Sequence, residues 1–223
     1  MILIISDEEY ISKAKILINS IRKFHDIKIH LHLVNYNIKL DVNNIEYSYS
    51  NLKLDNTNIK YWNSIKYTEK NAYCANIRVK IINQLLDNNP WILYIDADSI
   101  VRKSLNDFFK EIELYDLSAH YCDKKKYYKN GFRIRTGVLG INNSSIMKEF
   151  MNYYSNKINL FEWFSDQDTL QYTYLNYKKN IKFNKINSKY IDWNFKNESH
   201  IWTGKGESKY NNQNYINEEK KFT

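Results

Sequence analysis

The fold is decided by the stretch Trp91-Ile92-Leu93-Tyr94-Ile95-Asp96-Ala97-Asp98, in which five apolar residues run directly into an acidic pair. A continuous apolar run that ends in charge is typical of a central strand covered on both faces. Residues 87–90 (Asp-Asn-Asn-Pro) precede it, and they end a helix because proline cannot continue one. We therefore predict a buried strand over residues 91–95 with a helix directly before it.

Strands and helices are predicted to alternate on both sides of this central strand. The helix before it covers about residues 68–86, where apolar side chains recur at steps of three and four. Upstream, we predict strands at 2–5, 27–34 and 46–49 and a helix at 9–23, and we leave residues 50–67 unassigned. Downstream, we predict strands at 117–120 and 133–141 and helices at 105–111, 145–157 and 166–177. The alternation predicts an α/β fold with a mainly parallel central sheet flanked by helices.

Length and composition fit one folded domain. The chain has 223 residues, of which 43% are hydrophobic and 16% aromatic, and this excludes an intrinsically disordered chain. Five glycines and one proline are too few for collagen-like or low-complexity architectures. No linker separates two domains, and the chain is polar and rich in Asn and Lys from residue 207 onward. We predict a single domain over residues 1–209 and a polar C-terminal tail over 210–223 that frays.

Cysteine content and charge bear on location and partners. Cys74 and Cys122 are too few for a disulfide scaffold, so a reducing, cytoplasmic location is predicted. The N-terminal residues lack the charge pattern of a secretory signal, and no apolar run approaches 18 residues, so no membrane span is expected. The formal net charge of +8 fits anionic partners such as nucleotides, nucleic acid or acidic lipids, and it fits a lysine-rich solvated surface equally well.

Asp96 and Asp98 are the strongest chemical signal in the sequence. In open α/β sheets, ligands bind beyond the carboxyl ends of the strands, which is where this pair is predicted to lie. Two carboxylates leaving an apolar strand are costly to bury unless a cation neutralises them. Their hard oxygen atoms suit Mg²⁺ or Mn²⁺ bridging to phosphate. The alternative is an ordinary pair of surface acids, but the apolar run before the pair favours a metal site.

Two further segments are candidates for the same site. Asp166-Gln167-Asp168 follows Ser165 and opens a helix; N-terminal capping explains the acidic residues but not Gln167. Residues 200–209 begin with His200 and continue into a short loop with two glycines and two lysines. Such a segment is able to supply a metal ligand and cationic contacts to a diphosphate, although lone histidines are more often structural.

Together these pieces, in this order, resemble the GT-A (Rossmann-like) nucleotide-diphospho-sugar transferase fold. They are most similar to family 8 of the retaining glycosyltransferases, the glycogenin and bacterial galactosyltransferase group. The resemblance covers about residues 1–209. It implies transfer of a sugar from a nucleotide-diphosphate donor, a UDP-sugar, to an acceptor hydroxyl with retention of configuration, and Mn²⁺ or Mg²⁺ as the cofactor.

The resemblance also implies roles for individual residues. The metal ligands would be Asp96 and Asp98, from the family's Asp-x-Asp strand, and His200. Residues 4–10 resemble the family's first strand and base loop, and residues 200–209 its phosphate loop. The nucleotide-binding residues that follow from these matches and from the Asp-x-Asp strand are Asp7, Tyr10, Ala97, Gly204, Lys209 and Lys205.

The donor sugar is assigned from three more segments. Arg78-Val79-Lys80 is similar to the family's Arg-x-Lys helix, whose arginine reaches the sugar. Residues 135–142 look like the strand beneath the sugar, which implies roles for Thr136 and Gly137. Asp166-Gln167-Asp168-Thr169-Leu170 matches the family's Asp-Gln-x-x-Leu motif and implies two catalytic residues, Asp166 at a sugar hydroxyl and Gln167 near the anomeric face.

The last motif departs from the family pattern. That pattern is His-x-x-Gly-x-x-Lys-Pro-Trp, whereas Gly204 lies four residues after His200 and no Pro-Trp follows. Either Lys205 or Lys209 would contact phosphate, and we favour Lys209. The departures indicate a distant relative of the better-known members.

Two other functions are alternatives to sugar transfer for a chain with this acidic pair and this basic charge. A phosphohydrolase of the haloacid dehalogenase type would use Asp96 as its nucleophile, but its Gly-Asp motif is absent from the sequence. A basic nucleic-acid-binding domain predicts cations interleaved with aromatics, as in residues 124–129, but leaves the acidic residues unexplained. We therefore expect a nucleotide-sugar donor as the partner, and no nucleic acid.

Overall fold

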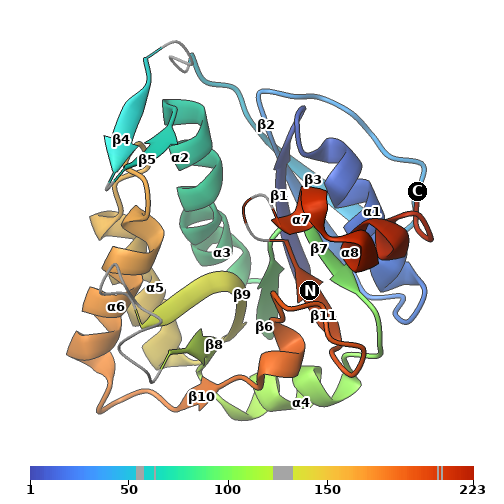
Figure 1. The fold of residues 1–223 in the computed structure, drawn as a ribbon. Helices are drawn as coiled ribbons and strands as arrows, with labels where there is room; N and C mark the ends of the chain where they lie inside the picture. The colour runs from blue at the N-terminus through green and yellow to red at the C-terminus, as the bar shows by residue number, and fades with distance from the viewer. Residues whose placement is uncertain (54–57, 63, 123–132, 205, 207) are drawn as a thin grey trace.

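The computed structural model of the chain describes residues 1–53, 58–62, 64–122, 133–204, 206 and 208–223. Among these residues, a seven-stranded sheet runs through the molecule in the order β10-β8-β9-β6-β1-β2-β3 (Figure 1). Its strands are β1 (Ile2–Asp7), β2 (Ile29–Val34), β3 (Ile45–Ser50), β6 (Trp91–Ile95), β8 (Leu117–Tyr121), β9 (Ile134–Asn142) and β10 (Phe183–Lys185).

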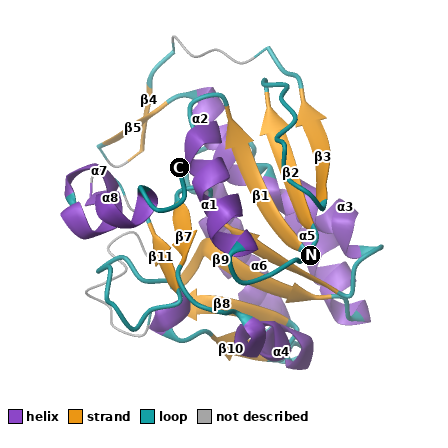
Figure 2. Ribbon diagram, turned by 90° about the vertical axis from the view of Figure 1, so that its right-hand side faces the viewer, coloured by secondary structure: helices purple, strands orange, loops and turns teal. Residues whose placement is uncertain are grey.

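Most neighbouring strands of this sheet are parallel. β1 pairs in parallel with β2 and β6, β2 with β3, and β8 with β10. Only β9 runs against its neighbours β6 and β8 within the described sheet. Figure 2 shows β1, β2 and β3 side by side. The structure thus confirms the predicted α/β architecture with a mainly parallel sheet.

Two hydrophobic cores cover the two faces of the sheet, because alternate side chains of a strand point to opposite faces. Ile2 and Ile4 of β1 enter one core, with α1 (Ile11–Arg22) and α4 (Asn106–Leu114). Leu3 and Ile5 enter the other. The helices of that second core are α2 (Glu69–Asn76), α3 (Arg78–Leu86), α5 (Ser145–Lys157) and α6 (Ser165–Tyr177). Burial on both faces explains why β1 and β6 read as continuous apolar runs.

The single helix predicted over residues 68–86 is in fact two helices. α2 (Glu69–Asn76) begins at a capping box on Thr68 and ends before Ile77, and α3 follows directly. At the junction, Arg78 Nε donates to the carbonyl oxygen of Ala75 at 2.5 Å. The side chain of Arg78 therefore caps the end of α2, which periodicity alone does not reveal.

The C-terminal segment, predicted as a polar tail over residues 210–223, is largely helical in the structure. It contains the second half of α7 (Ser208–Asn211) and all of α8 (Gln213–Glu219), which lie beside α1 (Figure 1). Tyr215 is fully buried and packs in a third core with Ile16, Trp202 and Phe222. The polar composition concealed two apolar anchors, Tyr215 and Phe222, which hold the segment on the protein.

Smaller elements complete the fold. β7 (Ser99–Val101) pairs antiparallel with β11 (Ile201–Thr203), directly after the acidic pair. A hairpin of β4 (Lys60–Trp62) and β5 (Ile65–Tyr67) occupies part of the stretch that the sequence left unassigned. The last element within the described residues is the short 3-10 helix η2 (Ser188–Tyr190). None of the described helices is both long enough and apolar enough to cross a bilayer.

Candidate active site

A cavity of about 740 Å³ lies where β1 and β6 end, at the carboxyl edge of the sheet. This is the position that parallel α/β sheets reserve for ligands. Most of the site residues predicted from the sequence line it. They are Asp7, Tyr10, Arg78, Asp96, Ala97, Asp98, Thr136, Gly137, Asp166, Gln167 and Gly204.

Gly137 allows β9 to approach the first aspartate closely. The backbone N–H of Asp96 donates to the carbonyl oxygen of Gly137 at 2.9 Å. A Cβ atom at Gly137 would lie 2.8 Å from Oδ2 of Asp96, closer than such contacts occur. Glycine at this position therefore makes room for the Asp96 carboxylate.

Arg78 joins three elements at the floor of the cavity. Its Nη1 donates to Oδ1 of Asp96 at 2.9 Å and to the carbonyl oxygen of Thr136 at 3.1 Å. Its Nη2 lies 3.2 Å from Oδ2 of Asp166, and its guanidinium lies 4.6 Å from the ring centroid of Tyr94. Burial opposes the charged form, but Tyr94 and the two carboxylates more than offset it and raise the pKa of Arg78. The guanidinium is thus a fixed, buried positive charge.

Asp96 accepts a second hydrogen bond from the other side. Tyr94 Oη donates to Oδ1 of Asp96 at 2.6 Å, and burial keeps the pKa of Tyr94 well above its usual range, so the phenol remains a donor. Burial also raises the pKa of Asp96 to about 6, against the opposing effect of Arg78. A cation beside Asp96 would favour its ionised form.

Asp166 is fixed at the start of α6 by neighbours on three elements. Thr136 Oγ1 donates to its Oδ2, and Tyr154 Oη donates to its backbone carbonyl at 2.6 Å. Its backbone N–H donates to Oδ1 of Asn76 at 3.1 Å. Phe164, the residue before the helix, has a left-handed φ of 64°, which turns the chain into α6 at this point. The carboxylate is 3% exposed and is held with little freedom.

Asp98 lies between a lysine and a glycine. Lys209 Nζ donates to its Oδ2 at 2.6 Å and to Tyr10 Oη at 3.0 Å. The carbonyl oxygen of Asp98 accepts from Gly204 N at 2.9 Å and from Tyr215 Oη at 2.6 Å. A Cβ atom at Gly204 would lie 2.9 Å from Cγ of Asp98, so glycine is needed there as well. The C-terminal helices thus support the acidic pair directly.

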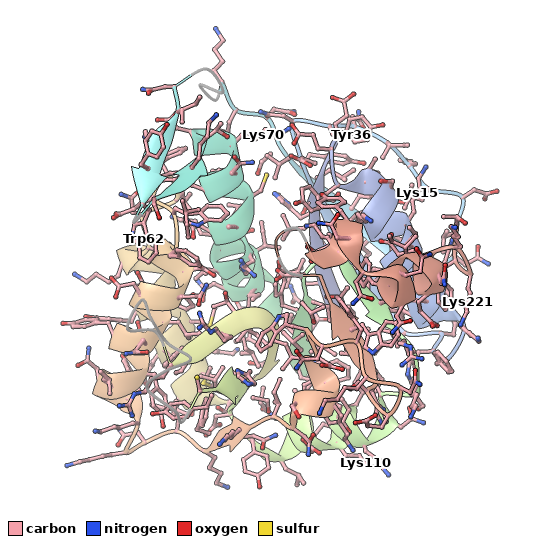
Figure 3. The ribbon with its side chains drawn as sticks, in the orientation of Figure 1. Lys15, Tyr36, Trp62, Lys70, Lys110 and Lys221 are labelled. Atoms are coloured by element: carbon pink, nitrogen blue, oxygen red, sulfur yellow. The ribbon has the colours of Figure 1, made fainter. Side chains whose placement is uncertain are left out.

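Asp7 marks the other end of the cavity, at the end of β1. Its Oδ1 accepts from Tyr10 N at 3.0 Å, and its Oδ2 lies 2.9 Å from Nζ of Lys70, which Figure 3 labels. Lys70 Nζ also lies 2.9 Å from Oε1 of Glu9. These contacts hold the loop after β1 against α2.

Gln167 lies on the opposite wall, where its Oε1 accepts from Arg135 Nη1 at 3.0 Å. Next to it, Phe164 packs against Trp62, which Figure 3 labels, with ring centroids 4.6 Å apart. Trp163 and Trp193 also line the cavity. The predicted catalytic pair therefore borders an aromatic wall that the sequence analysis missed, because no pattern separates these tryptophans from core residues.

The structure does not bring His200 to the acidic pair. His200 Nδ1 lies 2.7 Å from the carbonyl oxygen of Ser104, and its ring packs on Tyr190. His200 lies just before Ile201, the first residue of β11, which pairs with Val101. Asp98 lies at the opposite end of this pairing, where it contacts Gly204. No group of three or more His, Cys, Asp or Glu side chains in the described part of the chain could hold a metal ion. The structure therefore does not bring the predicted third ligand, His200, together with the pair, since β11 lies between them.

The two lysines of this loop have different outcomes. Lys209 does not line the cavity but contacts Asp98, as described above, whereas Lys205 lies outside the described residues. Thr203 also lines the cavity, and the sequence analysis missed it. Counting back from Lys209 and Gly206, rather than forward from His200, places Thr203 where the family pattern has its histidine. That alternative alignment was the signal available in the sequence.

Comparison with known proteins supports the fold through structure alone. No protein-family model matches the sequence, and no curated protein matches it. A solved structure of the galactosyltransferase LgtC in complex with donor and acceptor sugar analogs is similar, with a TM-score of 0.62 and 16% identity over 100% of this chain and 96% of that one. The bifunctional glycosyltransferase WbbM has a TM-score of 0.59 and 14% identity over 98% of this chain and 49% of its own. The glycosyltransferase GlyE of Streptococcus pneumoniae TIGR4 has a TM-score of 0.55 and 16% identity, over 95% of this chain and 56% of its own.

These similarities establish the fold of the chain. The chain has the GT-A fold of glycosyltransferases, as the resemblance in the sequence predicted. The likeness to LgtC extends over nearly the whole length of both chains.

Proposed function

We propose that this chain is a metal-dependent glycosyltransferase that moves a sugar from a UDP-sugar to an acceptor hydroxyl with retention. One observation carries the proposal: Arg78 joins Asp96 and Asp166 in a single cavity at the carboxyl edge of a GT-A sheet. A buried cation between two carboxylates, opening on a cavity of this size, is suited to a polar ligand that carries both a sugar and phosphates.

The nucleotide would lie at the β1 end of the cavity. Asp7 and Tyr10 line this end and are tied together through the backbone of Tyr10. A carboxylate accepts hydrogen bonds from the N–H of a base or from ribose hydroxyls. Similarity of the fold to LgtC, which was solved with donor and acceptor sugar analogs, supports a nucleotide-sugar donor.

The diphosphate would lie beside the acidic pair. Asp96 and Asp98 are the residues that would hold a divalent cation, since carboxylate oxygens suit Mn²⁺ or Mg²⁺. When bound, that ion would neutralise the charge that grows on the departing diphosphate. Lys209, 2.6 Å from Asp98, would add a second positive charge from the protein, worth more in a cavity than in water.

The donor sugar would lie between Arg78, Asp166 and Gln167. Transfer breaks the bond from the anomeric carbon to the diphosphate oxygen and forms one to the acceptor oxygen, whose proton passes to the departing diphosphate. The fixed carboxylate of Asp166 accepts from a sugar hydroxyl and orients the ring. Gln167, held by Arg135, presents an amide dipole near the anomeric carbon, where positive charge develops. Retention is carried over from the family resemblance.

No observation favours either alternative function. Asp96 as a phosphohydrolase nucleophile would have one oxygen bonded to Arg78 and Tyr94 and the other against Gly137. The basic stretch 124–129, on which a nucleic-acid-binding function depended, lies outside the described residues. The free thiols of Cys74 and Cys122 fit the proposed cytoplasmic location.

Hydrolysis of a panel of nucleotide sugars tests this function without knowledge of the acceptor. We expect slow, Mn²⁺-stimulated release of UDP from one or more UDP-sugars by the wild type, and loss of release in Asp166→Asn. Equal release by wild type and variant, or none from any donor, would contradict the proposal. Glu149→Gln, an exposed change on α5, is the matched control and should release UDP as the wild type does.

A further inference from the structure

We propose that the hydroxyl of Thr203 is the third protein ligand of the divalent cation, together with the carboxylates of Asp96 and Asp98. The cation site of this chain is then built from oxygen atoms alone, with a threonine where a histidine was expected. This inference rests on the proposed function, because it assigns a residue to the cation that the transfer requires.

Thr203 carries a buried polar atom that lacks a partner. The residue is 2% exposed, and its Oγ1 has no hydrogen-bond partner among the residues that the structure describes. Leaving a hydroxyl buried and unpaired is unfavourable, so native proteins rarely do so without a reason. Thr203 lines the same cavity as Asp96 and Asp98. A ligand in that cavity is the available partner for this oxygen.

The strand pairing places Thr203 next to the acidic pair. Thr203 ends β11 opposite Ser99, and the following residue, Gly204, donates its N–H to the carbonyl oxygen of Asp98. The carboxylate of Asp98 packs against Gly204, where an added Cβ would lie 3.0 Å from Oδ2. Thr203 is therefore the direct chain neighbour of Gly204, the residue that contacts Asp98. His200, four residues before Gly204, lies at the far end of the strand and is engaged with Ser104.

The donor chemistry agrees with this position. Hydroxyl oxygens of Ser and Thr bind Mg²⁺ in phosphate-binding loops, so a threonine is a competent ligand. An all-oxygen set suits Mg²⁺ and Mn²⁺, whereas an imidazole favours later metals such as Co²⁺ and Zn²⁺. The substitution of an imidazole by a hydroxyl should therefore show in metal selectivity as well as in affinity.

Ser99 provides a matched control. It is paired with Thr203 across β7 and β11, is 1% exposed, and also has an Oγ without a partner in the described part of the chain. Unlike Thr203, Ser99 does not line the cavity. Removing either hydroxyl should disturb the small sheet similarly, but only Thr203 should affect the cation.

The test measures Mn²⁺ binding to the UDP-saturated protein from the paramagnetic resonance signal of free Mn²⁺. Thr203→Val should weaken Mn²⁺ binding at least about tenfold, since even residues behind a ligand often cost that much. Thr203→Ser, which keeps the oxygen, should stay within about threefold of wild type, and Ser99→Ala should be unchanged. Thr203→His should raise the affinity for Co²⁺ relative to Mg²⁺.

Three results would overturn the inference. They are unchanged Mn²⁺ affinity in Thr203→Val, an equal loss in Ser99→Ala, and unchanged metal selectivity in Thr203→His. If Thr203→Val does not fold by circular dichroism, the Thr203→Ser and Thr203→His variants decide. If the wild type hydrolyses a UDP-sugar and these variants bind metal as the wild type does, Thr203 is not a metal ligand but the proposed function still holds. If the wild type binds neither UDP nor Mn²⁺, both the inference and the proposed function are contradicted.

Discussion

Lys209 Nζ lies 2.6 Å from Oδ2 of Asp98, although 111 positions separate the two residues in the chain. Burial alone would lower the pKa of Lys209, but its ion pair with Asp98 and the hydrogen bond that it donates to Tyr10 outweigh this effect, so the net pKa is raised. The ammonium therefore stays charged at neutral pH. It ties the C-terminal segment to the acidic pair, and under the proposed function it would add positive charge beside a bound diphosphate.

Replacing this lysine should weaken diphosphate binding selectively. We expect Lys209→Met to bind UDP about tenfold more weakly, because one charge-assisted contact to phosphate contributes about 1.5–3 kcal/mol. Calorimetric titration with UDP and with uridine separates the phosphate from the nucleoside. Uridine affinity should not change, and Lys110→Met, at a side chain 75% exposed, should bind both like wild type. An equal loss for both ligands would place Lys209 in a general structural role.

Removing Arg78 should destabilise the fold strongly. Arg78→Ala leaves the carboxylates of Asp96 and Asp166 without their buried partner, and breaking such a pair costs about 3–5 kcal/mol. Urea denaturation measures the loss in the free energy of unfolding. Lys148→Ala, which removes an exposed ion pair with Asp87, should cost less than about 1 kcal/mol. A loss below that value for Arg78→Ala would contradict the network described here.

The C-terminal helix should contribute to stability through one aromatic anchor. Tyr215 is fully buried and donates to the carbonyl oxygen of Asp98, so Tyr215→Ala should cost about 3–5 kcal/mol. Tyr210, in the same segment, is 57% exposed, and Tyr210→Ala should stay within about 0.5 kcal/mol. The comparison uses the midpoints of chemical denaturation. Similar small effects for both variants would mean that the segment frays in solution.

Acid should destabilise the protein through a buried histidine on β2. Burial lowers the pKa of His32 from 6.5 to about 4, with a smaller effect from His30. The unfolded chain therefore binds a proton that the folded chain resists, and stability falls as the pH drops from 6.5 to 4, by up to about 3 kcal/mol. Denaturation at several pH values checks this. His32→Asn should reduce the slope in that range, and an identical slope in both proteins would contradict the assignment.

The sequence predicted those parts of the site that follow directly from strands. β1 and β6 are buried on both faces, so their apolar runs end where Asp7 and Asp96 begin, and the edge of a parallel sheet brings these ends together. Arg78 and Asp166 were predicted from their motifs. In the structure, Arg78 contacts the carboxylates of both Asp96 and Asp166.

The failures have a common cause in contacts between distant segments. The break between α2 and α3 depends on Arg78 reaching a carbonyl, which periodicity does not encode. His200 was placed by counting from a motif, whereas the register of β11 against β7 decides which residue meets Asp98. The C-terminal segment looked like a tail because two buried aromatic residues carry most of its packing within a polar composition.

Thermal denaturation with UDP and Mn²⁺ is the decisive measurement for a metal-dependent nucleotide site at the acidic pair, since it needs neither acceptor nor sugar identity. We expect UDP and Mn²⁺ together to raise the melting temperature of the wild type more than either does alone, and Asp98→Ala to abolish the added shift. A wild type that UDP and Mn²⁺ leave unchanged, or an Asp98→Ala variant that keeps the full shift, would contradict such a site.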